Sequence, residues 1–120
     1  MTAPVTAIIG YDLDYLETLP TLAPHLPGLG EKLASNPATI EPGAFRNSSL
    51  QAAYVMIAAR ALGLDCGPMS GFDNDAVDQD FFAATPNWKS NFICSVGYGD
   101  YDKLHPRAPR PEFARFNQLL

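Results

Sequence analysis

The sequence has little positive charge: its 120 residues include eight Lys and Arg against thirteen Asp and Glu, and the formal net charge is −5. A chain without an excess of Lys and Arg cannot neutralise many phosphates, which argues against nucleic-acid binding. Cysteine is also scarce, because only Cys66 and Cys94 occur and neither belongs to a CxxC pair. We therefore expect reduced thiols, with no disulfide framework and no cysteine-bound metal.

Long apolar runs are absent as well. No stretch reaches the length that crosses a bilayer, and no basic segment precedes an apolar one at the start of the sequence. We expect a cytoplasmic protein with no membrane partner. There is no G-x-S-x-G motif, and His25 and His105 lie beside prolines without a second ligand at a useful spacing. The residues alone indicate no catalytic side chain and no metal site.

The sequence does contain a globular balance of 47% hydrophobic and 18% charged residues, in a length that suits at most one domain. Residues 4–11 (PVTAIIGY) and 91–98 (NFICSVGY) are short, apolar and rich in β-branched side chains, which predicts two buried strands. Residues 15–40 carry four prolines and predict loops, with one short helix near residues 15–22.

Residues 44–62 (AFRNSSLQAAYVMIAARAL) predict the longest helix, and Gly63 after them is typical of a left-handed helix cap. Beyond Leu50 the helix carries only two strongly polar side chains, so it must be buried on nearly every side. Two strands and a few short helices cannot cover it. We infer that a second subunit or a further segment of the same protein supplies the rest.

Residues 66–73 (CGPMSGFD) are rich in Gly and Pro and predict a turn, after which Asp73 or Asn74 can cap a short helix. Val77 and Phe81 are four residues apart and are expected to face the core. The acidic residues of this stretch lack the spacing of a calcium loop and are interpreted as a solvated face: Asp73, Asp75, Asp78 and Asp80.

The charges are distributed unevenly along the chain. Ten of the thirteen acidic residues lie before residue 81, whereas four of the eight basic ones lie after residue 100: Lys103, Arg107, Arg110 and Arg115. Prolines keep this tail extended. The charge pattern fits both a solvated basic tail and a site for a single phosphate.

Three segments, AFRNSSLQAAYVMIAARALGLDCGPMSGFDNDAVDQDFF, KSNFICSVGYGD and RAPRPEF, together with the opening TAPVTAIIGYD, resemble the flavin-dependent nitroreductase family. The resemblance covers essentially the whole chain and is closest to the malonic semialdehyde reductases of uracil (pyrimidine) degradation. It implies an α+β fold, with a sheet flanked by helices and a buried central helix, and a homodimer with FMN at the subunit interface. Residues 1–120 are expected to be the C-terminal portion of that domain, because the family's N-terminal Arg-rich segment has no counterpart here.

The resemblance also implies cofactor-binding residues. The turn after the central helix would contact the isoalloxazine ring, with backbone N–H groups near flavin N5, through Pro68, Met69, Ser70 and Gly71. Near the C-terminus, Arg107 matches the family's phosphate-binding position and Arg110 is a second candidate, since a guanidinium suits a phosphate. Many relatives carry a Lys two residues before this Arg, where the chain has His105, a departure from the family pattern.

The activity implied is that of an FMN-dependent oxidoreductase that takes hydride from NADH or NADPH and passes it to a small acceptor. For the subgroup the acceptor is malonic semialdehyde, reduced to 3-hydroxypropionate, and a nitro compound or a quinone is the nearest alternative. Two hypotheses of another class stay open. The chain is a truncated, non-catalytic remnant that dimerises and binds flavin weakly, or it is a partner subunit completed by another chain.

Overall fold

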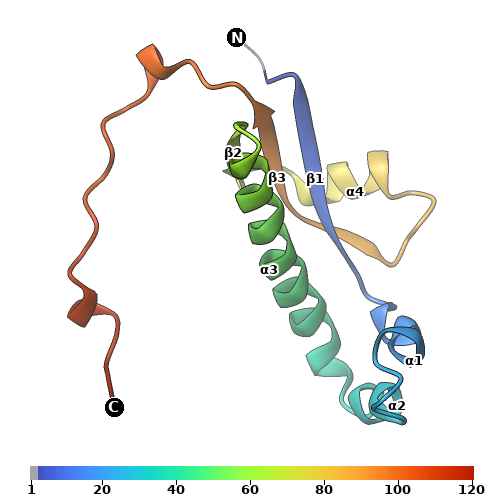
Figure 1. Cartoon of the computed structure of the whole chain (residues 1–120). Helices are drawn as coiled ribbons and strands as arrows, with labels where there is room; N and C mark the ends of the chain where they lie inside the picture. Colours follow the sequence, from blue (N-terminus) through green and yellow to red (C-terminus); the bar gives the residue numbers. More distant parts are fainter. Residues whose placement is uncertain (1–2) are drawn as a thin grey trace.

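The structure is a computed structural model that describes residues 3–120. It consists of a three-stranded antiparallel sheet, a long helix against that sheet and an extended C-terminal tail (Figure 1). The strands are β1 (Val5–Asp12), β2 (Asp65–Met69) and β3 (Trp88–Gly97), in the order β1-β3-β2. Only β3 pairs on both sides, so β1 and β2 are edge strands. Both predicted strands are present, and the α+β class is confirmed.

The helical segments are short, with one exception. They comprise a 3₁₀ turn (Tyr15–Thr18), α1 (Leu19–Leu22), α2 (Leu29–Ala34), a 3₁₀ turn (Pro37–Thr39), α3 (Ile40–Ala61), α4 (Asn74–Phe81) and 3₁₀ turns in the tail (Tyr101–Lys103 and Phe113–Arg115). The loop-like character predicted for residues 15–40 is confirmed, since that stretch holds only single helical turns and α2. Among the described residues, no helix is long and apolar enough to span a bilayer.

The long helix α3 begins at Ile40, four residues before the predicted start. Pro42 and Gly43, which resemble a helix breaker, lie inside its first turn. The first N–H groups of a helix have no intrahelical acceptor, so the missing N–H of a proline costs nothing there. The Pro-Gly pair, which would interrupt a helix in its interior, is therefore compatible with the first turn of α3.

The other end of α3 is the cap that the sequence predicts. Gly63 has a φ of 83°, in the left-handed region that glycine adopts most easily. Its N–H donates to the Arg60 carbonyl at 3.0 Å, and the N–H of Leu64 donates to the Ala59 carbonyl at 3.0 Å. This pair of bonds satisfies the last carbonyls of the helix and turns the chain back toward the sheet.

The segment predicted as a turn, residues 66–73, is a turn only in its second half. Its first half belongs to β2, in which Pro68 lies opposite Cys94 on β3. A proline cannot donate a ladder hydrogen bond, and it is tolerated here because β2 is an edge strand. The predicted cap of α4 is confirmed, since the Asp73 carboxylate accepts the N–H of Ala76 at 3.1 Å.

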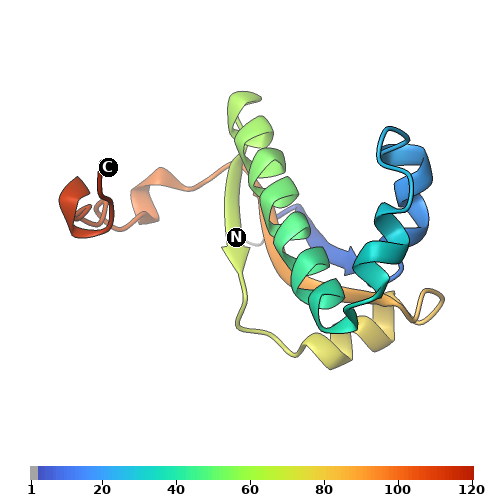
Figure 2. The same ribbon diagram turned by 90° about the horizontal axis from the view of Figure 1, so that it is seen from below.

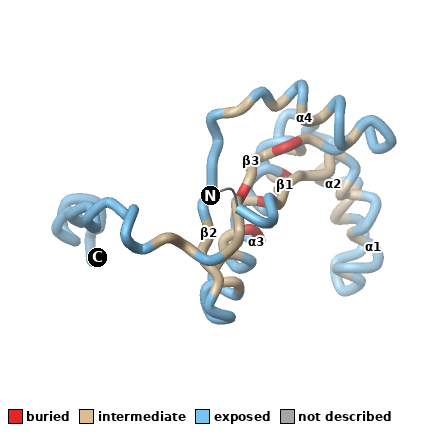
Figure 3. Tube along the Cα trace, turned by 90° about the horizontal axis from the view of Figure 1, so that it is seen from above, coloured by how far each residue is buried: buried red, intermediate tan, exposed pale blue. Residues whose placement is uncertain are grey.

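Helix α3 lies along one face of the sheet, and α4 lies beyond the other (Figure 2). The contact between α3 and the sheet is made by small side chains four residues apart, Ala44, Ser48 and Ala52, which are among the few buried residues (red in Figure 3). The Ser48 hydroxyl donates to the Gly10 carbonyl of β1 at 2.8 Å. Small residues allow the helix backbone to approach the strand closely, which fixes the height of α3 above the sheet.

Two expectations for α4 are wrong. Phe82, just after the helix, packs on the sheet and meets Trp88 edge-on with ring centroids 5.8 Å apart, whereas Phe81 is exposed. The helix ends at Phe81, so the next residue turns inward. Asp78 is not part of a solvated face, because its carboxylate accepts the N–H of Ser90 at 2.7 Å and pairs with Lys89.

The expected burial of α3 is not reached within this chain. Its outer face leaves Tyr54 and Ile57 exposed by 75% and 64%. The accessible surface is 9571 Å², whereas a compact protein of this mass has about 6,300 Å². The radius of gyration is 18.1 Å against about 14 Å for a compact domain. Part of the surplus surface is the outer face of α3, which the sequence predicts should be covered by something else, and part is the extended tail.

Candidate functional site

The segment predicted to contact a flavin ring lies at the open edge of the sheet. Pro68 and Met69 end β2, opposite Cys94 and Ile93, while Ser70 and Gly71 follow as irregular chain. All four of these predicted ring-contacting residues are exposed. Within residues 3–120 the backbone N–H groups of Ser70 and Gly71 donate no hydrogen bond. The segment therefore presents two adjacent unused donors.

The surroundings of Gly71 are open. A Cβ added there would meet no atom within 4 Å, and φ is not in the left-handed region. Nothing within the described chain therefore requires glycine at this position. The absence of a side chain leaves the backbone accessible to a flat group that lies against it.

The two arginines predicted to bind phosphate lie on the tail. Arg107 and Arg110 are exposed, and neither forms an ion pair with an acidic residue of the described chain. Arg110 donates only to the Ala108 carbonyl, at 3.1 Å. In both ribbon views the tail runs away from the sheet (Figures 1 and 2). The structure thus leaves both guanidinium groups free for an anion but does not bring them against Ser70 and Gly71.

The tail is tied to the sheet at its root by a residue that sequence reasoning missed. The carboxylate of Asp65, the first residue of β2, accepts the N–H of Gly99 at 2.8 Å and the hydroxyl of Tyr101 at 3.2 Å. It also pairs with Arg60 near the end of α3. Gly99 and Tyr101 lie 34 and 36 residues from Asp65 in the sequence. No local spacing could therefore have revealed their contact with it.

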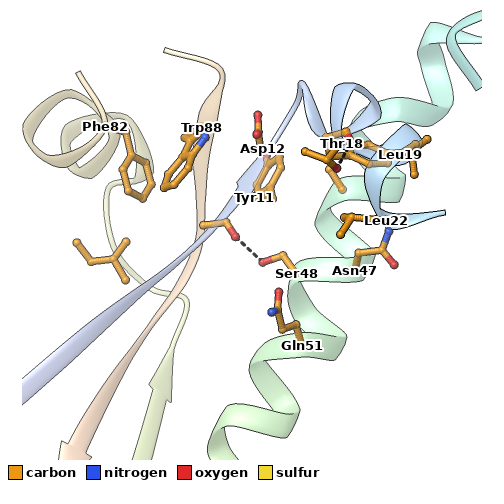
Figure 4. Close-up of a pocket in the computed structure, with 14 residues that line it drawn as sticks. Tyr11, Asp12, Thr18, Leu19, Leu22, Asn47, Ser48, Gln51, Phe82 and Trp88 are labelled. Carbon is orange, nitrogen blue, oxygen red and sulfur yellow. Dashed lines mark hydrogen bonds between the residues drawn. The ribbon is translucent and has the colours of Figure 1, made fainter. Parts of the chain in front are cut away.

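A separate cavity of about 520 Å³ opens between β1, α1 and α3 (Figure 4). Most of its lining is apolar, with Phe82 and Trp88 at one end and the polar side chains of Asn47 and Gln51 on the α3 wall. None of the predicted cofactor-binding residues lines it. Sequence reasoning missed this cavity, because its walls come from four stretches of chain that the fold alone brings together.

Two groups beside these features have shifted acidities. Burial raises the pKa of Tyr11 to about 12, helped by its hydrogen bond to Glu41 at 2.9 Å and by the charge of that carboxylate. Burial also raises the pKa of the Cys94 thiol, with the neighbouring Cys66 adding to the effect. Both groups are thus held in their neutral forms, and a thiol with a raised pKa is a poor nucleophile.

The cysteines and the possible metal ligands of the described chain matter here, because the sequence predicts neither a disulfide nor a bound metal. Cys66 and Cys94 are both free thiols, and no cluster of three His, Cys, Asp or Glu side chains occurs among residues 3–120. The groups that remain available for binding are the two unused N–H donors, the free guanidinium groups and the apolar cavity. Taken separately, the N–H donors suit a polar ring edge, the guanidinium groups suit an anion, and the cavity suits an apolar group.

These features can be placed among known proteins. The sequence profile of the nitroreductase family matches residues 2–98, and the chain belongs to that family. A relative from Caulobacter sp. (strain K31) is 58% identical over all 120 residues, and one from Stutzerimonas stutzeri is 56% identical over 96% of the chain. Both are provisionally named NADH dehydrogenase/NAD(P)H nitroreductase. The resemblance to the family that the sequence suggested is thereby confirmed.

Solved structures agree on the fold. A nitroreductase of Bacillus subtilis superimposes with a TM-score of 0.84 at 19% identity, covering 98% of this chain and 64% of that one. A nitroreductase of Exiguobacterium sibiricum in complex with FMN gives a TM-score of 0.78 at 16% identity, covering 98% and 63%. The chain spans about three fifths of the length of the curated relatives, 60% and 58% for the two above.

The predicted cofactor-binding residues can be compared with the two ends of FMN, its isoalloxazine ring and its phosphate. Ser70 and Gly71 offer unused donors beside open space, which suits the edge of an isoalloxazine ring. Arg107 and Arg110 offer free guanidinium groups, which suit its phosphate. Each set suits one end of the cofactor by its donor chemistry, although the structure does not bring the two sets together.

Proposed function

We propose that this chain forms part of an FMN-dependent oxidoreductase that uses NADH or NADPH as the electron donor. The observation that carries the proposal is the pair of unused N–H donors at Ser70 and Gly71, on an open edge of a nitroreductase-family fold. When bound, FMN supplies the hydride-transfer chemistry. The chain's own task is to bind and orient it, through Ser70 and Gly71 at the ring and Arg107 and Arg110 at the phosphate.

The proposed acceptor is malonic semialdehyde, reduced to 3-hydroxypropionate. It rests on the resemblance of the sequence to that subgroup, because a fold does not fix a substrate. The names of the relatives support a nitro compound as the alternative acceptor, and a quinone is a further alternative that rests on the family resemblance. A cytoplasmic location is part of the proposal, and the free thiols of Cys66 and Cys94 support it.

A homodimer is proposed as the working form. The support is the uncovered apolar face of α3, where Tyr54 and Ile57 are largely exposed, and an accessible surface that exceeds the compact value by about half. Family membership favours the enzyme over the alternative, a non-catalytic remnant or a partner subunit.

The proposal is tested by titrating the chain with FMN and with riboflavin, which lacks the phosphate. We expect FMN to bind more tightly. Arg107→Ala should weaken FMN binding about 10- to 100-fold, since a charge-assisted hydrogen bond is worth roughly 1.5–3 kcal/mol, and leave riboflavin binding unchanged. Arg115→Ala, at another exposed arginine of the tail, serves as the control. An equal loss for both ligands would show that Arg107 acts on the structure instead.

Turnover is tested separately. The FMN-loaded chain is expected to oxidise NADH or NADPH in the presence of malonic semialdehyde, and replacement of the aldehyde by a quinone or a nitroaromatic compound ranks the acceptors. Tight FMN binding without oxidation of either nucleotide would contradict the enzyme proposal for this chain.

A further inference from the structure

The root of the tail is fixed by one carboxylate. Asp65 stands at the first position of β2, and its side chain is 26% exposed. One oxygen, Oδ2, accepts both the Gly99 N–H at 2.8 Å and the Tyr101 hydroxyl at 3.2 Å, while Oδ1 pairs with Arg60. The carboxylate therefore joins the end of α3, the start of β2 and the beginning of the tail at a single point.

Glycine at position 99 allows the close contact with Asp65. A Cβ added to Gly99 would lie 2.9 Å from Oδ2 of Asp65, closer than such atoms approach one another. Two residues earlier, a Cβ on Gly97 would lie 2.6 Å from Cδ of Pro4. The backbone at the end of β3 and just after it therefore passes close to Pro4, which precedes β1, and to the side chain of Asp65.

Asp65 is also the last tie between the tail and the rest of the described chain. Beyond Lys103 the hydrogen bonds of the tail are local, such as Arg110 to Ala108 and Asn117 to Phe113. From Tyr101 to Arg107 the chain advances six residues, which span at most about 20 Å. The position of the Asp65 contact therefore limits the region that the Arg107 guanidinium can reach.

We infer that Asp65 is a positioning residue for phosphate binding, holding the tail root so that Arg107 and Arg110 lie within reach of the phosphate of FMN. The inference rests on the proposed function. Asp65 cannot itself serve the phosphate, because two anions repel each other. Its effect is indirect: release of the tail lets the arginines sample a larger volume, which lowers their effective concentration at the site.

The experiment is a double-mutant cycle. FMN and riboflavin dissociation constants are measured for the unaltered chain, Asp65→Ala, Arg107→Ala and the double variant. We expect Asp65→Ala to weaken FMN binding about fivefold or more, the lower end of ordinary couplings between sites, with riboflavin unchanged. In the Arg107→Ala background the same substitution should have a smaller effect, because only Arg110 is then left for the tail to position. Additive losses, or an equal loss for both ligands, overturn the inference.

A second variant guards against misfolding. Gly99→Ala retains the carboxylate but places a Cβ 2.9 Å from its Oδ2, which disturbs the contact between Asp65 and the tail, so it should reproduce the selective loss of FMN binding. Asp102→Ala, at an exposed acidic residue of the same stretch that makes no ion pair in the described chain, is the matched control and should change neither constant. Selective loss in the control as well overturns the inference.

Failure of the proposed function can be recognised separately. Hydrogen exchange of the Gly99 amide is measured without any flavin, and it should accelerate in Asp65→Ala. If the unaltered chain does not distinguish FMN from riboflavin, the proposed role of the tail in binding is wrong, and the inference about phosphate falls with it. If the chain does distinguish them and Gly99 exchange is unaffected by Asp65→Ala, only the positioning role is overturned.

Discussion

Single residues set how α3 meets the sheet. The pairing of β1 with β3 shifts between Ile9 and Gly10, so β3 carries one extra residue, Asn91. A bulge of this kind redirects a side chain. Here the Asn91 amide reaches α3 and donates to the Ser49 hydroxyl at 2.9 Å, while Ser48 bonds to Gly10 at 2.8 Å. These two directional hydrogen bonds therefore fix the rotation of α3 about its own axis, which its small contact side chains would not fix by themselves.

Tyr11 gives a pH-dependent prediction. Its pKa is about 12 in the folded chain, against 10.0 for an ordinary tyrosine, because the phenol is partly buried and donates to Glu41. Above pH 10 the unfolded chain loses this proton first. The contribution to stability is therefore complete below about pH 10 and declines as the pH rises to about 12.

Tyr11→Phe, which preserves the ring that meets Phe45 edge-on, should flatten this alkaline decline in denaturant-unfolding measurements. Tyr98→Phe, at a tyrosine that is 80% exposed, is the control and should leave the decline unchanged. An unaltered pH dependence in Tyr11→Phe would contradict the assignment.

At the scale of elements, the sequence predicts the two capped helix ends better than it predicts the start of α3 or the strand β2. The cap at Gly63 and the cap at Asp73 follow from local hydrogen bonding, which short patterns capture. The strand β2 is missed because Pro68 weakens a strand pattern, and only the position of β2 at an edge makes that proline acceptable. Such a position is a property of the whole sheet.

The two glycines on either side of β2 provide a matched test of the helix cap. Gly63→Ala forces a side chain into the left-handed region, so it should reduce the free energy of unfolding by about 1–2 kcal/mol although the added Cβ meets no atom. Gly71→Ala also meets no atom but requires no left-handed backbone, and it should change stability by less than about 0.5 kcal/mol. Equal effects in chemical denaturation would argue against a conformational role for Gly63.

At the scale of the whole molecule, the sequence predicted the α+β architecture and a long helix that this chain leaves partly uncovered. An apolar helix with too few partners indicated that cover must come from elsewhere, and the exposed face of α3 is consistent with that. The cavity, the contact of Phe82 with Trp88 and the Asp65 cluster could not be predicted, because each joins residues far apart in the chain. The predicted flavin-binding residues stay predictions, since their positions were carried over from a family resemblance.

The uncovered face predicts self-association. We expect the chain to sediment as a dimer, with a melting temperature that rises with protein concentration. Ile57→Lys places a charge on the exposed face of α3 and should shift the chain toward monomer while leaving the fold of the monomer intact, because Ile57 is 64% exposed. Gln79→Lys, at an exposed position of α4, adds the same charge elsewhere and should not. A chain that is monomeric at every concentration would contradict the dimer.

The small side chains beneath α3 also have a calorimetric consequence. Ala44, Ser48 and Ala52 seat the helix while removing little apolar surface from water, and no large side chain is fully buried in the described chain. The heat-capacity increment of unfolding grows with the apolar surface that unfolding exposes, at about 12–15 cal/mol/K per residue in ordinary domains. The heat capacity of the isolated chain should therefore rise less on unfolding than its length implies. Association with a partner that covers α3 should bring the increment back to the ordinary value.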